Sequence, residues 1–194
     1  MPNPIILEEF WYGLDEYVRN DILNNCHEEY DNFLQGKEFN VELVKKYFKV
    51  FGSGFLRCAQ TGKLESVKMY IQLGADIHML NNDAVKYAAD RGHLNVVKYL
   101  VELGADIHAE DDYALRWAAY NGHLEVVKYL VEQEANIHAD NNLALQWAAE
   151  RGYLDIVKYL VECSAKINAR NNWALQLASN NNHPEVVKYL KSLT

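Results

Sequence analysis

A nine-residue segment of this chain returns at a fixed interval of thirty residues. It reads GHLNVVKYL from Gly92, GHLEVVKYL from Gly122, GYLDIVKYL from Gly152 and NHPEVVKYL from Asn182, and a weaker copy, GKLESVKMY, begins at Gly62. A fixed period in this range is the signature of a solenoid, in which one small unit buries its apolar face only by stacking on the next copy. The repeat therefore restricts the chain to a stack of similar units.

Each unit is predicted to contain two helices joined by a tight turn. The first helix carries small and aliphatic residues, as in ALRWAA at 114–119, and this spacing lets neighbouring backbones approach closely. The second helix carries an apolar stripe, as in LEVVKYLVE at 124–132. Between them, the glycine that opens each nine-residue segment supplies a left-handed turn, and Asn182 takes that place in the last copy.

The outer side of the second helix is predicted to be a solvated, charged face. Acidic residues stand three positions before lysines, as Glu65 does before Lys68 and Glu125 before Lys128. Pairs at this spacing are neighbours on a helix surface and stabilise it by about 0.2–0.5 kcal/mol each. A ridge of lysines matched in this way indicates solvation rather than an anion site.

The connector between units is predicted to be a short extended finger. In ADIHA at 105–109 the alternation turns the isoleucine inward and leaves its neighbours exposed. Gly74 and Gly104 end the second helix, but Glu134 and Ser164 occupy the same column in later units. If the backbone stays left-handed there, each of these two residues carries strain of about 1 kcal/mol.

A polar residue that favours helix N-termini stands before each of four first helices. A side-chain oxygen at this position can accept a hydrogen bond from an unpaired amide of the first turn. The pattern therefore predicts N-caps at Asn82, Asp112, Asn142 and Asn172.

Composition and charge restrict the function further. The 194 residues are 49% apolar and 24% charged, as in a folded soluble protein, and the net charge of −8 opposes binding to nucleic acid. The three cysteines, Cys26, Cys58 and Cys163, form no CxxC motif and predict reduced thiols in an intracellular, cytoplasmic setting. We see no signal peptide and no apolar run long enough to span a membrane, so we expect a soluble monomer.

Histidines recur in two columns and raise the question of a metal site. Stacked helical units stand about 8–10 Å apart, whereas zinc binds nitrogen ligands at about 2.0–2.1 Å, so one ion cannot bridge a column. The second column, His93, His123 and His183, is predicted to form hydrogen bonds with the backbone at the turn. No nucleophile with a paired base and no phosphate-binding glycine loop is found, so we expect no enzyme and no cofactor. The columns are His78, His108 and His138, and His93, His123 and His183.

Residues 1–49 lack the repeat register, although their apolar positions fall at helical intervals. Because a solenoid needs its terminal apolar faces covered, the first interpretation is a helical N-terminal cap or a divergent repeat. The alternative is a separate recognition element.

The order of parts over 50–194, a helix with paired alanines, a Gly-His turn, a VVKYL helix and a GADIHA connector, resembles the ankyrin repeat. GHLNVVKYLVELGADIH at 92–108 resembles in particular the ankyrin proteins of large DNA viruses. The resemblance implies an all-α helical solenoid of about five units of thirty residues, with short extended fingers and a groove of fingers and first helices that binds other proteins.

Two features depart from the family pattern. The usual period is about 33 residues, so each unit here is three residues shorter. The missing residues fall between the second helix and the next first helix, so the fingers should be short. The family's TPLH segment, whose Thr and His brace the first helix, is absent at 83–86, 113–116, 143–146 and 173–176. We expect the Asn and Asp caps to replace that brace.

The columns that vary between units should lie on the groove, at the fingers and along the first helices. Tyr, Trp and Arg are the residue types that most often dominate interfaces. Drift of surface positions is the alternative explanation for any one residue. Trp117 and Trp147 are interpreted instead as core, because their column also holds Tyr87 and Leu177. The predicted partner-binding residues are Tyr113, Arg116, Tyr120, Glu150, Arg151 and Trp173.

Two functions follow from this pattern. The first is a non-enzymatic protein–protein interaction module that holds one partner protein in the groove, in the cytoplasm of a host cell if the chain is viral. The second is an adaptor, in which residues 1–49 dock a different protein such as a ubiquitin-ligase component.

Overall fold

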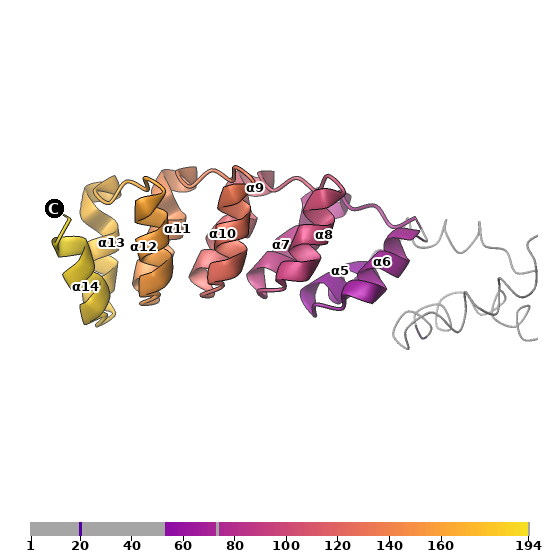
Figure 1. Ribbon diagram of the computed structural model, residues 1–194, viewed down its shortest axis with the longest axis horizontal. Helices are drawn as coiled ribbons and strands as arrows, with labels where there is room; N and C mark the ends of the chain where they lie inside the picture. The colour runs from indigo at the N-terminus through magenta and orange to yellow at the C-terminus, as the bar shows by residue number, and fades with distance from the viewer. Residues whose placement is uncertain (1–19, 21–52, 73, 194) are drawn as a thin grey trace, which may run out of the picture.

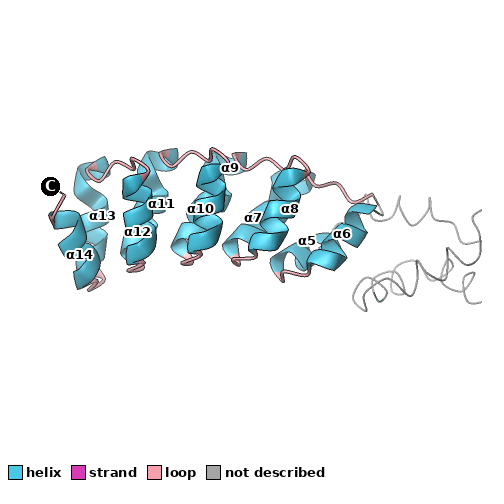
Figure 2. Cartoon of the chain, viewed as in Figure 1, coloured by secondary structure: helices cyan, strands magenta, loops and turns pink. Residues whose placement is uncertain are grey.

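The computed structural model describes residue 20 and residues 53–72 and 74–193. Within these ranges the chain forms ten α-helices and no strand (Figure 2). The predictions for residues 1–49, the cap and the adaptor segment, lie outside the described residues, apart from Asn20.

The helices follow one another in five pairs, each a first helix and a second helix joined by a tight turn. The first helices lie side by side in one layer, and the second helices form a second layer in front of them in Figure 1. The pairs are α5 Ser53–Gln60 and α6 Leu64–Gln72, α7 Met79–Asp90 and α8 Leu94–Glu102, α9 Ala109–Tyr120 and α10 Leu124–Glu132, α11 Ala139–Glu150 and α12 Leu154–Glu162, and α13 Ala169–Asn180 and α14 Pro184–Lys191.

The core runs continuously along the stack. The first helices contact one another more closely than the second helices do, because fully buried alanines such as Ala88, Ala118 and Ala148 separate them. The apolar stripe of each second helix closes the core, as Val127 and Leu130 do in α10. Cys58, which stands in the same column as these alanines, is buried as well.

The turn between the two helices of a pair is bonded to the next unit by a histidine. His123 Nε2 lies 2.9 Å from the carbonyl oxygen of Asp90, and His93 and His183 make the same contact with the preceding unit. The prediction that this histidine column bonds backbone is therefore confirmed, and the bond links one unit to the one before it.

The glycine of this turn is required for two reasons. Gly92 has φ +77°, where residues with a Cβ are strained. A Cβ on Gly92 would also stand 2.5 Å from His123 Nδ1, inside van der Waals contact. The turn glycine is thus required both for its left-handed backbone and for the close packing of the next unit's histidine ring against it.

The turn after the second helix has room for a Cβ, unlike the turn between the two helices. Gly104 has φ +93°, and a Cβ placed on it would meet nothing within 4 Å. The later units place Glu134 (φ 68°) and Ser164 (φ 72°) here. The predicted left-handed backbone at these two positions is confirmed, and both residues carry the backbone strain that a Cβ brings to this region.

The connector is more tightly turned than the extended finger predicted from the alternation. After α8 the chain turns at 103–104 and again at 107–108, so only Ala105 and Asp106 lie outside a turn. Ile107 points inward as predicted and is buried.

Three consecutive left-handed residues then open the first helix. In α9 they are Glu110, Asp111 and Asp112, with φ 54°, 54° and 56°, and residues 80–82 and 140–142 repeat the pattern. Asn and Asp tolerate this region better than other residues that carry a Cβ, but Leu80 and Glu110 do not share that tolerance. The right-handed part of the helix therefore begins only after this turn, and the finger that precedes it is short.

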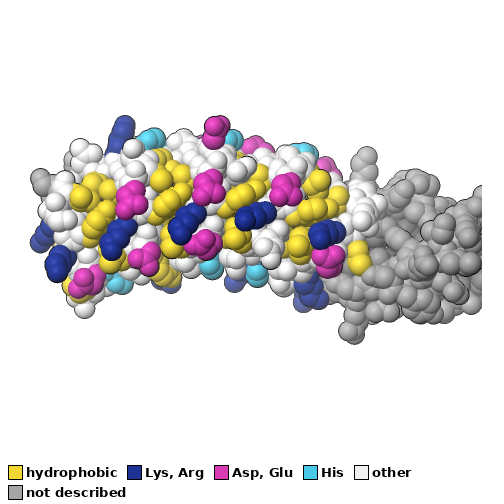
Figure 3. Space-filling view, in the orientation of Figure 1, with side chains coloured by type: hydrophobic (Ala, Val, Ile, Leu, Met, Phe, Trp, Pro, Cys, Tyr) yellow, Lys and Arg dark blue, Asp and Glu magenta, His cyan; other side chains and the backbone are white. Residues whose placement is uncertain are grey.

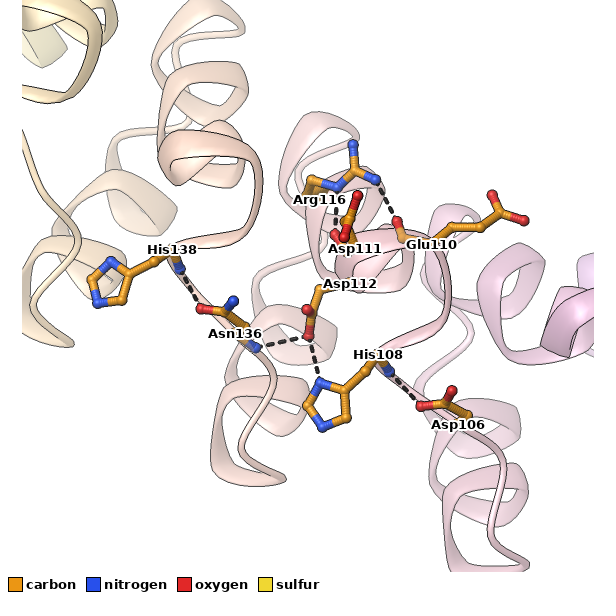
Figure 4. Close-up of polar contacts among 8 residues, drawn as sticks. All are labelled: Asp106, His108, Glu110, Asp111, Asp112, Arg116, Asn136 and His138. Carbon is orange, nitrogen blue, oxygen red and sulfur yellow. Dashed lines mark hydrogen bonds and ion pairs between the residues drawn. The ribbon is translucent and has the colours of Figure 1, made fainter.

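The predicted N-cap residues serve as a brace between units (Figure 4). Asp112 Oδ1 accepts hydrogen bonds from His108 Nδ1, at 3.0 Å, and from the amide of Asn136 in the next finger, at 2.7 Å. Asn82 and Asn142 make the equivalent bonds. These oxygens therefore link the start of one first helix to the finger before it and to the finger that follows. They replace the family's brace, as expected, but they accept these bonds instead of the helix-capping bonds predicted for them.

The second helices present a charged face in Figure 3. Lys128 bonds Glu125 at 2.8 Å and Lys68 makes the matching pair, as the spacing predicted. Lys98, which has no acid at that spacing, lies over the Tyr129 ring with its Nζ 5.5 Å from the centroid. These lysines of the outer face are therefore engaged within the fold.

Candidate functional site

Four aromatic rings gather where α9 packs against α11. Trp117 stacks on Tyr113 with centroids 5.5 Å apart and meets the rings of Tyr120 and Trp147 edge-on at 5.3 and 5.4 Å. Tyr120 meets Trp147 in the same way at 5.3 Å. Offset-stacked and edge-to-face pairs at these distances are the favoured geometries of aromatic rings. We call these four residues the aromatic cluster.

The aromatic cluster is separate from the core. All four side chains are half-buried, and none of them packs with the apolar residues between the helix layers. The prediction that Trp117 and Trp147 are core residues is therefore wrong. Leu115 and Ala118 of α9 take the core positions, and Trp117 lies on the stripe it shares with Tyr113 and Tyr120.

A signal for this arrangement exists in the sequence. Tyr113, Trp117 and Tyr120 follow the spacing i, i+4, i+7, which places them on one face of a helix. A column comparison along the repeats does not reveal it, because it compares each position with other units and not with its neighbours on the same helix.

Arg116 is held against the aromatic cluster by the left-handed turn of its own unit. Its Nε donates to the carbonyl oxygen of Asp111 at 2.8 Å, and its Nη2 donates to that of Glu110 at 2.6 Å (Figure 4). The guanidinium carbon lies 5.9 Å from the Trp147 ring centroid. Gln146, one unit later, bonds the carbonyl of Asn141 in the same way at 2.7 Å.

Arg151 lies on the other side of the aromatic cluster. The side chain is exposed, and its guanidinium carbon stands 5.0 Å from the Tyr120 ring centroid. Its neighbour Glu150 is half-buried, and the backbone oxygen of Glu150 accepts the bond from His183.

The structure thus brings together four of the six predicted residues, Tyr113, Arg116, Tyr120 and Arg151. Trp173 lies on α13, in the next unit but one from Tyr113, and 41% of its surface is exposed. Leu143 fills the same column between them. Trp173 therefore extends the same face toward the C-terminal end of the described stack.

A charge network that the column analysis missed lies between α7 and α9. The Lys86 side chain is 4% exposed, and its Nζ stands 2.7 Å from Asp83 Oδ1 and 2.6 Å from Glu110 Oε1. Burial alone would lower the pKa of Lys86, but the hydrogen bonds and charges of Asp83 and Glu110 outweigh it and raise that pKa. The hydrogen bonds that Lys86 and Asn81 donate lower the pKa of Glu110.

Lys86 also reaches the aromatic cluster. Its Nζ lies 5.5 Å from the Tyr113 ring centroid. Burial, and then the nearby acids Asp90 and Glu110, raise the pKa of Tyr113.

One of the variable columns expected on the groove lies at the fingers, where it is exposed and partly paired along the stack. We call it the fingertip column, and its residues are Leu80, Glu110, Asp140 and Arg170. Asp140 bonds Arg170 at 2.8 Å, and Glu110 bonds Lys86. Leu80 is 66% exposed. Two of the fingertip contacts are therefore internal to the fold.

Within the described residues, no group of three or more His, Cys, Asp and Glu side chains is arranged to hold a metal ion. In the same part of the chain, no helix has the length and apolar character needed to cross a membrane.

The family model described as ankyrin repeats (3 copies) matches residues 55–141 and again 134–193. No curated protein gives a significant match to the chain. The family model covers well over half of the chain and coincides with the five stacked helix pairs. The chain therefore belongs to the ankyrin-repeat family.

Proposed function

We propose that this protein is a non-enzymatic interaction module that binds a partner protein on the face of its first helices, at the aromatic cluster. Ankyrin repeats generally serve as protein–protein interaction modules. The observation that carries the proposal is that four half-buried rings stand together on this face without packing into the core.

Such a cluster suits binding for an energetic reason. Side chains that dominate interfaces are enriched in Trp, Tyr and Arg, and they lose less conformational entropy when they are held in place before the partner arrives. Here each ring is fixed by a neighbouring ring, and Arg116 is fixed by two backbone carbonyls. The surface is therefore preorganised.

The test is a double substitution on this face, Tyr113→Ala with Trp173→Ala. Partners captured from cell lysate by the unaltered chain are identified by mass spectrometry, and one is then titrated against the variants. We expect the double variant to bind at least about ten-fold more weakly, since truncating a dominant interface side chain commonly costs about 2 kcal/mol or more.

The matched control is Leu103→Ala, because Leu103 is an exposed apolar residue at the end of α8 and away from the cluster. Circular dichroism and a thermal melt establish that each variant is folded. If the double variant, while folded, binds as tightly as the control, the partner does not use this face and the proposal fails.

We further propose that the protein works in a reducing intracellular compartment, and in the host cytoplasm if it is viral. Cys163 is a free thiol, and free thiols persist in such compartments. Mass spectrometry with a thiol-labelling reagent on protein from intact cells tests this, because oxidised cysteines would contradict it.

The adaptor role rests on a separate observation, the helical spacing of apolar residues within 1–49 in the absence of the repeat register. A chain that begins at residue 50 distinguishes the two interpretations. If it stays folded and loses one captured protein while it keeps another, residues 1–49 dock a second partner. If it unfolds, they serve as a cap.

A further inference from the structure

Two guanidinium groups flank the aromatic cluster, and neither is paired with a carboxylate. Arg116 lies over Trp147 and Arg151 over Tyr120, and those two rings contact each other at 5.3 Å. Among the described residues, no Asp or Glu oxygen stands within ion-pairing distance of either guanidinium. The Glu110 carboxylate, which feels the charge of Arg116, is itself bound by Lys86.

Other cations on the first helices are paired within the fold. Lys86 bonds two carboxylates, Arg91 bonds Asp90 at 3.2 Å, and Arg170 bonds Asp140. The two arginines beside the aromatic cluster differ from these cations in this respect.

The stacking leaves the hydrogen-bonding edges of both groups available. A guanidinium packs on a ring through its flat face, while its N–H groups lie in the plane and can bind a carboxylate in bidentate fashion. Arg116 uses two of the five N–H groups that an arginine carries. The Arg151 side chain donates no hydrogen bond to the described residues, and it is exposed.

Any partner that covers the aromatic cluster also removes water from these two charges. Desolvating a charge without a compensating partner is strongly unfavourable, whereas a carboxylate placed against it restores the lost interactions. A neutral apolar segment would leave both cations under the interface without a counter-charge, and a basic segment would add repulsion.

We propose that the bound segment is an acidic peptide, in which an Asp or Glu side chain lies close to the apolar side chain that contacts the rings. The inference rests on the proposed function and specifies the partner's chemistry at the same site. Because the chain as a whole carries a net charge of −8, this attraction is local to the two arginines and opposed by the rest of the molecule. Contact geometry, rather than long-range steering, then selects the acidic segment.

The probe is a phage-displayed library of random twelve-residue peptides selected on the full chain. The most enriched sequences are synthesised with a fluorescent label and titrated against the chain and its variants. We expect Asp or Glu to be enriched beside an aromatic or aliphatic residue. Replacing that acid by Asn or Gln in the peptide should weaken binding by about ten-fold or more, as for other hydrogen bonds to charged groups.

The protein variant is Arg116→Gln with Arg151→Gln. Gln146 already bonds the equivalent turn carbonyl, so glutamine at 116 retains the local contact with the turn. The control is Lys68→Gln with Lys128→Gln, which changes the net charge equally but lies on the outer face in ion pairs. Only the arginine variant should lose the preference for acidic peptides.

Two results would overturn the inference in distinguishable ways. If the selected peptides lack acids and bind the arginine variant normally but not the Tyr113→Ala, Trp173→Ala variant, the face binds proteins without the acidic preference. If no selected peptide depends on Tyr113 and Trp173, the proposed function fails together with the inference.

Discussion

Replacing Gly92 with alanine should destabilise the stack far more than the same change at Gly104. Both glycines have left-handed backbones, with φ +77° and +93°. They differ in what a Cβ would meet, namely the His123 ring at 2.5 Å beside Gly92 and nothing within 4 Å at Gly104. The pair therefore separates backbone strain from close approach.

The magnitudes follow from these distances. At Gly104, alanine adds left-handed strain of about 1–2 kcal/mol, partly offset by about 0.4–1 kcal/mol from the reduced entropy of the unfolded chain, so we expect a loss of about 1 kcal/mol. At Gly92, overlap with the ring adds about 1–3 kcal/mol. The ring cannot swing away freely, because its Nε2 is bonded to the Asp90 carbonyl at 2.9 Å. The expected total is about 2–4 kcal/mol.

The assay is equilibrium denaturation in urea, followed by circular dichroism, with the m-value compared between variants. A His123→Ala substitution completes a double-mutant cycle. Once the ring is removed, Gly92→Ala should cost no more than Gly104→Ala, so the cycle should give a coupling energy of about 1–3 kcal/mol.

Equal losses for Gly92→Ala and Gly104→Ala would refute the reasoning, since they would show that the histidine ring yields without penalty. A coupling energy near zero with His123→Ala would lead to the same conclusion. In that case the glycine would be required for its φ alone.

The same assay checks four further predictions. Glu134→Gly should stabilise the stack by about 0.5–1 kcal/mol, because it relieves left-handed strain at φ 68° and gives back part of that gain in unfolded-state entropy. Ser66→Val should stabilise by about 1 kcal/mol, since Ser66 is 1% exposed and its Oγ has no hydrogen-bond partner among the described residues. Asp112→Asn should be nearly neutral, as asparagine takes this place in the neighbouring units, whereas Asp112→Ala should cost about 1–3 kcal/mol by leaving the next finger's amide unpaired. The folded-state pKa of Glu110 is lowered chiefly by its bond to Lys86, so the stability that this bond contributes is fully present above the ordinary pKa of 4.5 and is lost as the pH falls through the lowered pKa. Glu110→Gln should therefore flatten the pH dependence of the unfolding free energy in that acid range. An unchanged profile would contradict the pairing.

Much of the stack could be predicted from the sequence, because the features involved are local and repeated. The turn glycines, the left-handed Glu134 and Ser164, and the backbone contact of the His123 column all follow from the chemistry of one position within a fixed register. A repeat supplies that register without any knowledge of distant contacts.

The left-handed turn at the start of each first helix could not be predicted in this way. Leu80 and Glu110 have little preference for positive φ, and they adopt it within a turn whose last residue is bonded on both sides. Asp112 binds the ring of His108 and the amide of Asn136, which belong to different units. The conformation is set by contacts between units, which a local motif does not show.

A column comparison also could not predict whether Trp117 lies in the core or on the surface. An apolar column is compatible with the core and with an aromatic surface, because both favour large apolar side chains. The distinction comes from packing, in which Leu115 and Ala118 already fill the space between the layers. A column comparison does not reveal the ion pairs of Lys86 either, because its partner Glu110 stands in a different column and belongs to the next unit.

The clipped period also bears on where a partner can bind. The turn holds the fingers against the stack, and their polar groups are used there: the amide of Asn136 bonds Asp112, and Asp140 bonds Arg170. A partner that paired with Asp140 or Arg170 would have to displace the bond between them. One that covers Trp117 and its neighbouring rings displaces water from apolar surface, which is favourable. Recognition on the first helices is therefore the less costly route in this chain, and it supports the choice of the aromatic cluster over the fingers as the binding face.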